Sequence, residues 1–166
     1  KKKIKGKIFI KLIEKTPKGP ALTTQSIINI LSNNSPCVVI NSDQYIDFDM
    51  PRKIDNKKIY LPLHFNTHGN SSYADLDKKG KIIKIEEKKM ISFYASSGVY
   101  IFGSSEILKD SFKRFKEKKI TTEINMSNII NNYIKIKNIK AEPLVTFFKY
   151  DLGNIESIKI FKQLIN

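Results

Sequence analysis

Short apolar runs alternate with polar turns along the chain, and this pattern predicts both strands and helices. Strands are expected where apolar and β-branched residues cluster between turn-forming residues, at residues 8–13, 37–40, 59–65, 95–102 and 143–150. Helices are expected where apolar positions recur at helical spacing, at residues 21–31, 106–118, 124–133 and 155–165. Ser104, Thr122 and Asn154 are placed to cap three of them.

The order of these elements predicts an α/β fold. The strand at 8–13, the helix at 21–31 and the strand at 37–40 have the spacing of a βαβ unit, which favours a parallel sheet. Pro62 lies within the strand at 59–65 and should force an edge position or a bulge. Residues 73–87 alternate apolar and polar side chains about a Lys-Lys-Gly turn, which indicates a β-hairpin.

Polar clusters follow several of the predicted strands, and two of them contain an aspartate. Asp43 ends the cluster after strand 37–40, and Asp151 follows strand 143–150. In open α/β sheets, ligands bind beyond the carboxyl ends of the strands. Two aspartates at one sheet edge can share a Mg²⁺ ion that also holds substrate phosphates. Taken singly, however, each aspartate is more often a cap or a loop residue.

Length and charge restrict the class of protein without identifying it. The 166 residues fit one domain, taken here as 1–166, and no linker or repeat interrupts them. The formal net charge of +14 comes from 30 Lys and Arg against 16 Asp and Glu, which favours anionic partners. The lysines are dispersed rather than gathered into a basic arm, and this is typical of solvated faces. A nucleic-acid-binding domain would rest on charge alone, so no nucleic-acid partner is expected.

Cysteine content and hydropathy predict a cytoplasmic protein. The single cysteine excludes an internal disulfide framework and fits a reducing compartment. There is no signal-peptide pattern and no apolar run near the roughly 18 residues of a membrane span, so no membrane partner is expected. His64 and His68 have no Cys or third His nearby, and a zinc site is not expected.

Four segments together resemble one enzyme family. They read NSDQYID at 41–47, SYADLDKKGKIIKIEEKK at 72–89, YASSGVYIF at 94–102 and YDLGNIESI at 150–158. In this order and at these spacings they are similar to the sugar-phosphate nucleotidyltransferases, the pyrophosphorylases that make nucleotide sugars. No single segment is specific, but the resemblance covers nearly the whole chain from about Glu14.

The resemblance implies a fold and a reaction. The fold would be three-layer and Rossmann-like, of the GT-A or nucleotidyltransferase type, with a mixed, mostly parallel sheet, flanking helices and a β-hairpin insertion. The reaction would transfer a nucleotidyl group from an NTP to a sugar 1-phosphate, giving an NDP-sugar and pyrophosphate for surface polysaccharide synthesis. The cofactor would be Mg²⁺, held by Asp43 and Asp151.

The resemblance also implies roles for further residues. Glu87 would accept hydrogen bonds from sugar hydroxyls, and Lys88 would contact the sugar 1-phosphate as the catalytic residue. Gly98 would let the sugar approach the backbone, and Glu123 would lie on the sugar side. The nucleotide base would contact the loop 16–21, at Thr16, Gly19, Pro20 and Ala21.

The chain departs from the family pattern in several places. Lys89 stands where proline is usual, and Asn154 stands where threonine is usual. No Gly-x-Gly-[Ser/Thr]-Arg loop, the family's cradle for the triphosphate, precedes Glu14. We therefore expect an N-terminally truncated domain that spans the C-terminal two thirds of the usual fold. The alternative is a non-catalytic sugar-phosphate-binding or regulatory homologue. The base, the sugar and a homo-oligomeric state stay open.

Overall fold

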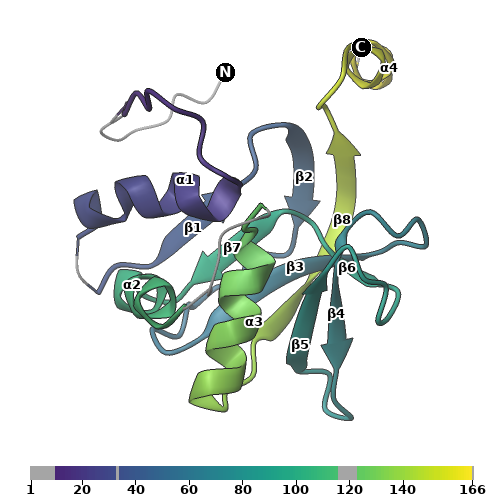
Figure 1. Ribbon diagram of the computed structural model, residues 1–166. Coiled ribbons are helices and arrows are strands. Elements are labelled where there is room, and N and C mark those ends of the chain that lie inside the picture. The colour runs from purple at the N-terminus through teal and green to yellow at the C-terminus, as the bar shows by residue number, and fades with distance from the viewer. Residues whose placement is uncertain (1–9, 33, 116–122, 166) are drawn as a thin grey trace.

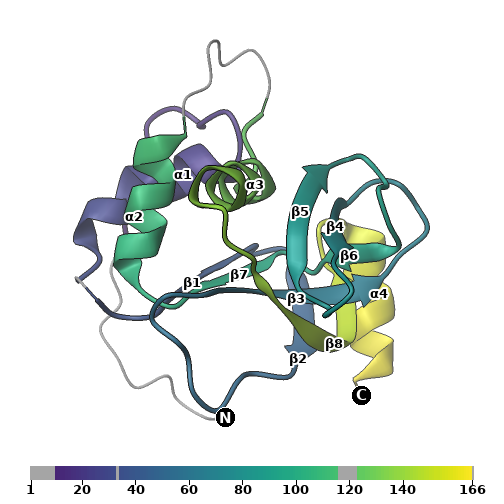
Figure 2. The same cartoon turned by 90° about the horizontal axis from the view of Figure 1, so that it is seen from below.

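The computed structural model shows how the strands and helices of the chain pack. It describes residues 10–32, 34–115 and 123–165. The helices among them are α1 (Pro20–Ile27) with a following 3₁₀ turn (Ile28–Ile30), α2 (Ser105–Arg114), α3 (Met126–Lys137) and α4 (Ile155–Leu164). Helices α1, α2 and α3 gather on one side of the sheet, whereas α4 lies apart beyond the last strand (Figures 1 and 2).

The described residues also form a mixed, eight-stranded sheet. Its strands are β1 (Cys37–Ile40), β2 (Gln44–Phe48), β3 (Ile59–Phe65), β4 (Ser72–Leu76), β5 (Ile82–Glu87), β6 (Tyr94–Ser96), β7 (Val99–Phe102) and β8 (Glu142–Asp151). The spatial order is β1-β7-β3-β6-β4-β5, and β8 pairs with both β3 and β2. The predicted α/β class, with a mixed sheet, flanking helices and a β4–β5 hairpin, is confirmed.

The prediction that the sheet is mostly parallel was wrong for the described strands. The pairing of β3 with β8 is parallel, and the other pairings in this part of the chain are antiparallel. The supposed βαβ unit fails because residues 10–13 form no strand, while residues 8 and 9 lie outside the described residues. Ile10 and Leu12 are exposed. An apolar run becomes a strand only where a neighbouring strand accepts its backbone hydrogen bonds.

Pro62 also differs from expectation, because it lies in a central strand rather than at an edge. Strand β3 has β8 on one side and both β6 and β7 on the other. The carbonyl of Pro62 accepts a hydrogen bond from Ser97 N, so the proline nitrogen faces that same side. Ser97 lies between the end of β6 and the start of β7, where the ladder is interrupted. A residue without an N–H is tolerated there because no regular ladder bond is lost.

The main core lies between the sheet and helices α1, α2 and α3. Helices α2 and α3 each present an apolar stripe at helical spacing, including Leu108 and Phe112 of α2 and Ile130 and Ile134 of α3. Burial of each such side chain stabilises the fold by about 1.5–3 kcal/mol. A smaller cluster on the opposite face of the sheet contains Tyr60, Val99 and Ile101.

The two faces of strand β1 differ in burial, although its sequence is apolar throughout. Cys37 and Val39 pack against the main core, whereas Val38 and Ile40 are exposed on the opposite face. Within the described residues β1 pairs with β7 alone. The strand therefore has partners on one side, and its apolar sequence overstates its burial. The ring of Phe147, in the apolar run of β8, is likewise 66% exposed.

The predicted helix caps are confirmed where the structure describes them. Ser104 Oγ accepts a hydrogen bond from Ile107 N at the start of α2, and Asn154 Oδ1 accepts one from Ser157 N at the start of α4. The expected cap Thr122 lies outside the described residues. Helix α3 instead begins after Asn125, which forms a capping box with Asn128. None of the helices in the described residues is long and apolar enough to cross a membrane.

Candidate functional site

A pocket of about 450 Å³ opens where the ends of several strands meet the first turns of α1 and α3. Its volume falls within the range of about 300–1,000 Å³ that is usual for small-ligand sites. The β1–β2 turn, β3, the β3–β4 loop, β5, the β6–β7 segment and β8 each contribute residues to the lining. Five predicted site residues line this one cavity: Pro20, Asp43, Glu87, Gly98 and Asp151.

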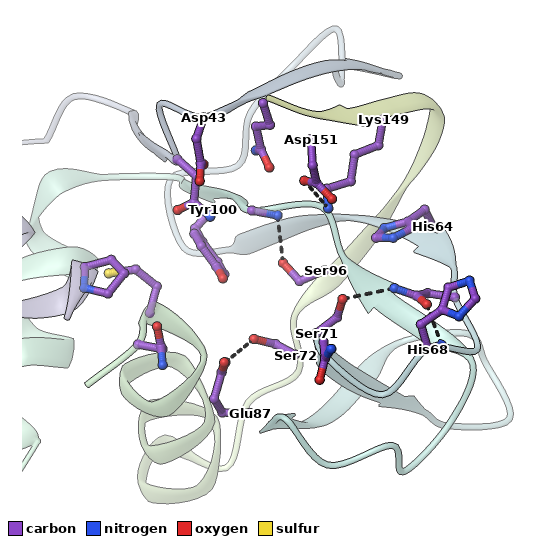
Figure 3. A pocket seen from close by; sticks show the side chains of 18 residues that line it. Asp43, His64, His68, Ser71, Ser72, Glu87, Ser96, Tyr100, Lys149 and Asp151 are labelled. Atoms are coloured by element: carbon purple, nitrogen blue, oxygen red, sulfur yellow. Dashed lines mark hydrogen bonds and ion pairs between the residues drawn. The ribbon is translucent and has the colours of Figure 1, made fainter. Parts of the chain in front are cut away.

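The two aspartates come together through the pairing of β2 with β8. Asp43 immediately precedes β2, and its carbonyl accepts a hydrogen bond of 2.7 Å from Leu152 N, the residue after Asp151. Their side chains lie along the same side of the pocket (Figure 3). Asp43 and Asp151 are 108 positions apart in sequence, and both thus lie at the same rim of the pocket.

This donor set fits a magnesium ion. Mg²⁺ prefers oxygen ligands and typically takes one or two protein carboxylates, keeping its other positions for water and substrate phosphates. Asp43 and Asp151 supply such a pair, and among the described residues no group of three or more His, Cys, Asp or Glu side chains forms a closed metal cage. The magnesium assignment stays a prediction.

Glu87 faces the aspartates from across the pocket (Figure 3). It ends β5 opposite Ser72 of β4, and Ser72 donates a hydrogen bond to its Oε2 atom. Ser127, in the first turn of α3, donates a second bond of 2.7 Å to the same oxygen. Two hydroxyls therefore fix this carboxylate, while Oε1 has no donor among the described residues and can accept from a ligand.

Gly98 lies at a sharp backbone break rather than inside one continuous strand as predicted. The segment divides into β6 and β7, and Gly98 has a φ of 74°. A Cβ atom here would lie 2.7 Å from Gln44 Oε1 and 2.8 Å from Asn41 Nδ2. Gln44 Nε2 also donates to Ser97 O at 2.7 Å. Glycine is required because the left-handed backbone and two pocket side chains leave no room for a side chain.

Polar side chains that line the pocket, or lie directly behind it, bond to one another and fix its shape. His64 Nδ1 lies 3.1 Å from Ser97 Oγ, which lies 2.8 Å from Thr146 Oγ1. Burial, assisted by the charge of Lys149, lowers the pKa of His64. Burial also raises the pKa of Tyr100, whose phenol therefore stays protonated and able to donate. Both rings present neutral polar atoms to the pocket at neutral pH.

The remaining predicted site residues do not line this pocket. Lys88 and Glu123 are exposed, as is Thr16. Ala21 is fully buried in the core. A Cβ atom on Gly19, which has a φ of 101°, would overlap the backbone of Ile124.

The loop 16–21 is tied to the chain beside Glu123. Ile124 N donates to Lys18 O at 2.9 Å, and Ala21 N donates to Ile124 O at 3.1 Å. These bonds and the close approach of Gly19 to the backbone of Ile124 explain structurally why the loop contains a Gly-Pro sequence. Pro20 alone reaches the pocket lining, and the base-binding role of the loop stays a prediction.

Lys149 is the pocket residue that sequence reasoning missed most clearly. It lies on β8, and its Nζ atom forms an ion pair of 2.9 Å with Asp151 Oδ1. Ser72, Ser127 and Gln44 were also missed. A lysine two positions before a predicted metal ligand was the available signal, because alternate residues of a strand share one face.

Comparison with known proteins gives one family match and several similar structures. A family model for nucleotidyl transferases matches residues 4–165. No curated protein was found to match the chain. A nucleoside-diphosphate-sugar pyrophosphorylase from Vibrio cholerae has a TM-score of 0.74 at 20% identity, over 91% of this chain and 67% of that one.

Two further structures are similar. A Bacillus anthracis protein described as a glucose-1-phosphate thymidylyltransferase has a TM-score of 0.70 at 21% identity, over 91% of this chain and 62% of its own. A UDP-glucose pyrophosphorylase bound to UDP-glucose has a TM-score of 0.67 at 17% identity, over 90% and 64%. At these identities the likeness establishes the fold. The chain spans about two thirds of the length of these structures.

Proposed function

The chain belongs to the nucleotidyl transferase family, and from this premise we propose that it takes part in nucleotidyl transfer from an NTP to a sugar 1-phosphate. The products are an NDP-sugar and pyrophosphate. The observation that carries the proposal is the single pocket lined by Asp43, Glu87, Gly98 and Asp151. Carboxylates on one side suit a cation that holds phosphates, and a fixed carboxylate across from them suits a hydroxyl-rich sugar.

The reaction needs no nucleophile from the protein. A phosphate oxygen of the sugar 1-phosphate attacks the α-phosphorus of the NTP, the new P–O bond forms, and the bond to the departing pyrophosphate breaks. Alignment and neutralisation of charge contribute most of the catalysis in such transfers. Mg²⁺ held by Asp43 and Asp151 would supply that neutralisation when bound.

Glu87 and Gly98 have complementary parts in holding the sugar. The Oε1 atom of Glu87 accepts from a sugar hydroxyl, because Ser72 and Ser127 occupy Oε2. Gly98 has no side chain of its own, so the ligand can approach the backbone between β6 and β7 where the side chains of Gln44 and Asn41 lie against it. Both contacts orient the sugar so that its phosphate points toward the aspartates. Loss of either should raise the barrier through misalignment.

The proposal is tested by measuring pyrophosphate release from the full-length protein with a panel of NTPs and sugar 1-phosphates. Release that requires a sugar 1-phosphate and Mg²⁺ is expected, and Asp43→Asn should abolish it. Asp47→Asn is the matched control, because Asp47 lies on β2, is exposed and does not line this pocket. Unchanged turnover by Asp43→Asn would remove the metal assignment. Binding of a sugar phosphate without any pyrophosphate release would favour the non-catalytic homologue.

A further inference from the structure

The pocket contains more negative than positive side chains. Asp43, Glu87 and Asp151 all line it, whereas Lys149 is the only lysine or arginine among the described lining residues. A phosphate monoester carries a charge of about −1.5 to −2 at neutral pH. Such an anion needs a cationic side chain close to its oxygens, in addition to any metal ion, to offset the three carboxylates.

Lys149 is positioned to supply that charge. It lies two residues before Asp151 on β8, so both side chains leave the same face of the strand. The Lys149 side chain is 16% exposed, whereas its partner Asp151 is 70% exposed. Both side chains line the pocket and are joined by their ion pair, as Figure 3 shows for the two labelled residues, and the lysine is the more deeply buried of the two.

Lys88, the lysine expected from the sequence to meet the phosphate, is placed differently. It directly follows Glu87, but its backbone turns into the left-handed region with a φ of 51°. Its N–H donates to Ser71 O at 3.0 Å, which holds this turn. Its side chain is exposed and lies outside the pocket lining. The turn directs Glu87 and Lys88 to different surroundings.

We propose that Lys149, rather than Lys88, binds the phosphate of the sugar 1-phosphate, and that its ion pair with Asp151 couples phosphate binding to cation binding. This inference rests on the proposed function. Without a ligand, Lys149 neutralises Asp151. When phosphate arrives, Lys149 turns to the phosphate oxygens and Asp151 becomes available to the cation.

The coupling has two consequences of opposite sign. A cation that binds alone must compete with Lys149 for Asp151, so Lys149 weakens the binding of the cation alone. A phosphate that draws Lys149 away removes this competition, so phosphate and cation strengthen each other's binding reciprocally. A purely structural role of Lys149 would not separate these two effects.

Isothermal titration of Lys149→Met with Mg²⁺ alone, and with inorganic phosphate or glucose 1-phosphate in the presence of Mg²⁺, tests the inference. Methionine retains most of the apolar stem and removes the charge. Losing a charge-assisted hydrogen bond should weaken phosphate and glucose 1-phosphate binding about 10- to 100-fold. Mg²⁺ alone should bind about two- to fivefold more tightly, which matches the strength of an exposed ion pair.

Lys88→Met is the matched control and should change each affinity by less than about threefold. If Lys88→Met weakens phosphate binding and Lys149→Met does not, the inference is overturned and the proposed function stands. Weaker binding of both Mg²⁺ and phosphate to Lys149→Met, with a lower melting temperature, would assign the lysine a structural role and also overturn it. If neither phosphate nor glucose 1-phosphate binds the unaltered protein, the inference fails and the proposed function loses its support as well.

Discussion

Replacing Gly98 with alanine should destabilise the protein through two separate effects. The backbone at Gly98 has a φ of 74°, where a residue with a Cβ atom costs roughly 1–2 kcal/mol. The added atom would also lie 2.7 Å from Gln44 Oε1 and 2.8 Å from Gln44 Nε2. Gln44 must then move and lose its hydrogen bond to Ser97 O, at a cost of about 0.5–1.5 kcal/mol. The expected loss in unfolding free energy is therefore about 1.5–3.5 kcal/mol.

Gly80→Ala is a control that has the backbone effect without the crowding, so comparison with it isolates the crowding at Gly98. Gly80 has nearly the same backbone conformation, with a φ of 73°, but nothing lies within 4 Å of a Cβ atom built there. Its substitution should cost the conformational part alone, roughly 1–2 kcal/mol. The difference between the variants, about 1 kcal/mol, measures the crowding by Gln44.

Urea unfolding followed by far-ultraviolet circular dichroism suits this comparison, because the chain has no tryptophan to report by fluorescence. Gly98→Ala should also weaken sugar-phosphate binding, since Asn41 and Gln44 line the pocket. Gly80, in the β4–β5 turn, does not line it, and Gly80→Ala should retain affinity. Equal destabilisation by the two substitutions would refute the crowding at Gly98.

Two further predictions concern carboxylates with defined partners. Glu87→Gln replaces the charged acceptor of the Ser72 and Ser127 hydroxyls, so it should lower the unfolding free energy by about 1–2 kcal/mol and weaken sugar-phosphate binding at least tenfold. Thermal melts measure the change in stability, and titration with the sugar phosphate measures the change in affinity. Unchanged affinity would contradict the role of Glu87 in binding the sugar. A hydrogen bond from Lys140 lowers the pKa of Asp77 from 3.8 to about 2. Because folding lowers this pKa, the stabilisation of the folded protein by the Asp77 carboxylate is complete above about pH 4 and is lost as the pH falls toward 2. The unfolding free energy of Asp77→Asn, measured over this pH range, should therefore depend less on pH than that of the unaltered protein. An equal dependence on pH would contradict the lowered pKa of Asp77.

Local signals predicted many element positions. Ser104 and Asn154 cap the helices that follow them, because a side-chain oxygen before an apolar helical stripe satisfies an exposed backbone N–H. The β4–β5 hairpin follows from its alternation and from Gly80, whose left-handed backbone closes the turn. In each case the determining residues lie within a few positions of one another.

Strand direction and burial could not be predicted in the same way, because they depend on partners distant in sequence. Strand β1 pairs antiparallel with β7, more than 50 residues later, and nothing in its own apolar sequence specifies that direction. Its apolar pattern also does not reveal that Ile40 is 58% exposed. Pro62 was expected at an edge or a bulge, because the interruption between β6 and β7 that accommodates it is a feature of another segment.

The candidate site was predicted in part. Resemblance identified Asp43, Glu87, Gly98 and Asp151, which line one pocket. Lys149 escaped notice because one lysine carries little information in a chain with 30 Lys and Arg residues. The serines that hold Glu87 were missed for a similar reason, since isolated hydroxyls have no distinguishing pattern before the fold brings them to a carboxylate.

Amide chemical-shift mapping tests most directly whether this pocket receives the sugar phosphate. The isotopically labelled protein would be titrated with a panel of sugar 1-phosphates in the presence of Mg²⁺. The expected result is a set of shifts at Asp43, Glu87, Gly98 and Asp151, with helix α2 unchanged on the far side of the core. Shifts confined to another surface, or no shifts with any sugar 1-phosphate, would contradict the assignment of this pocket as the sugar-phosphate site.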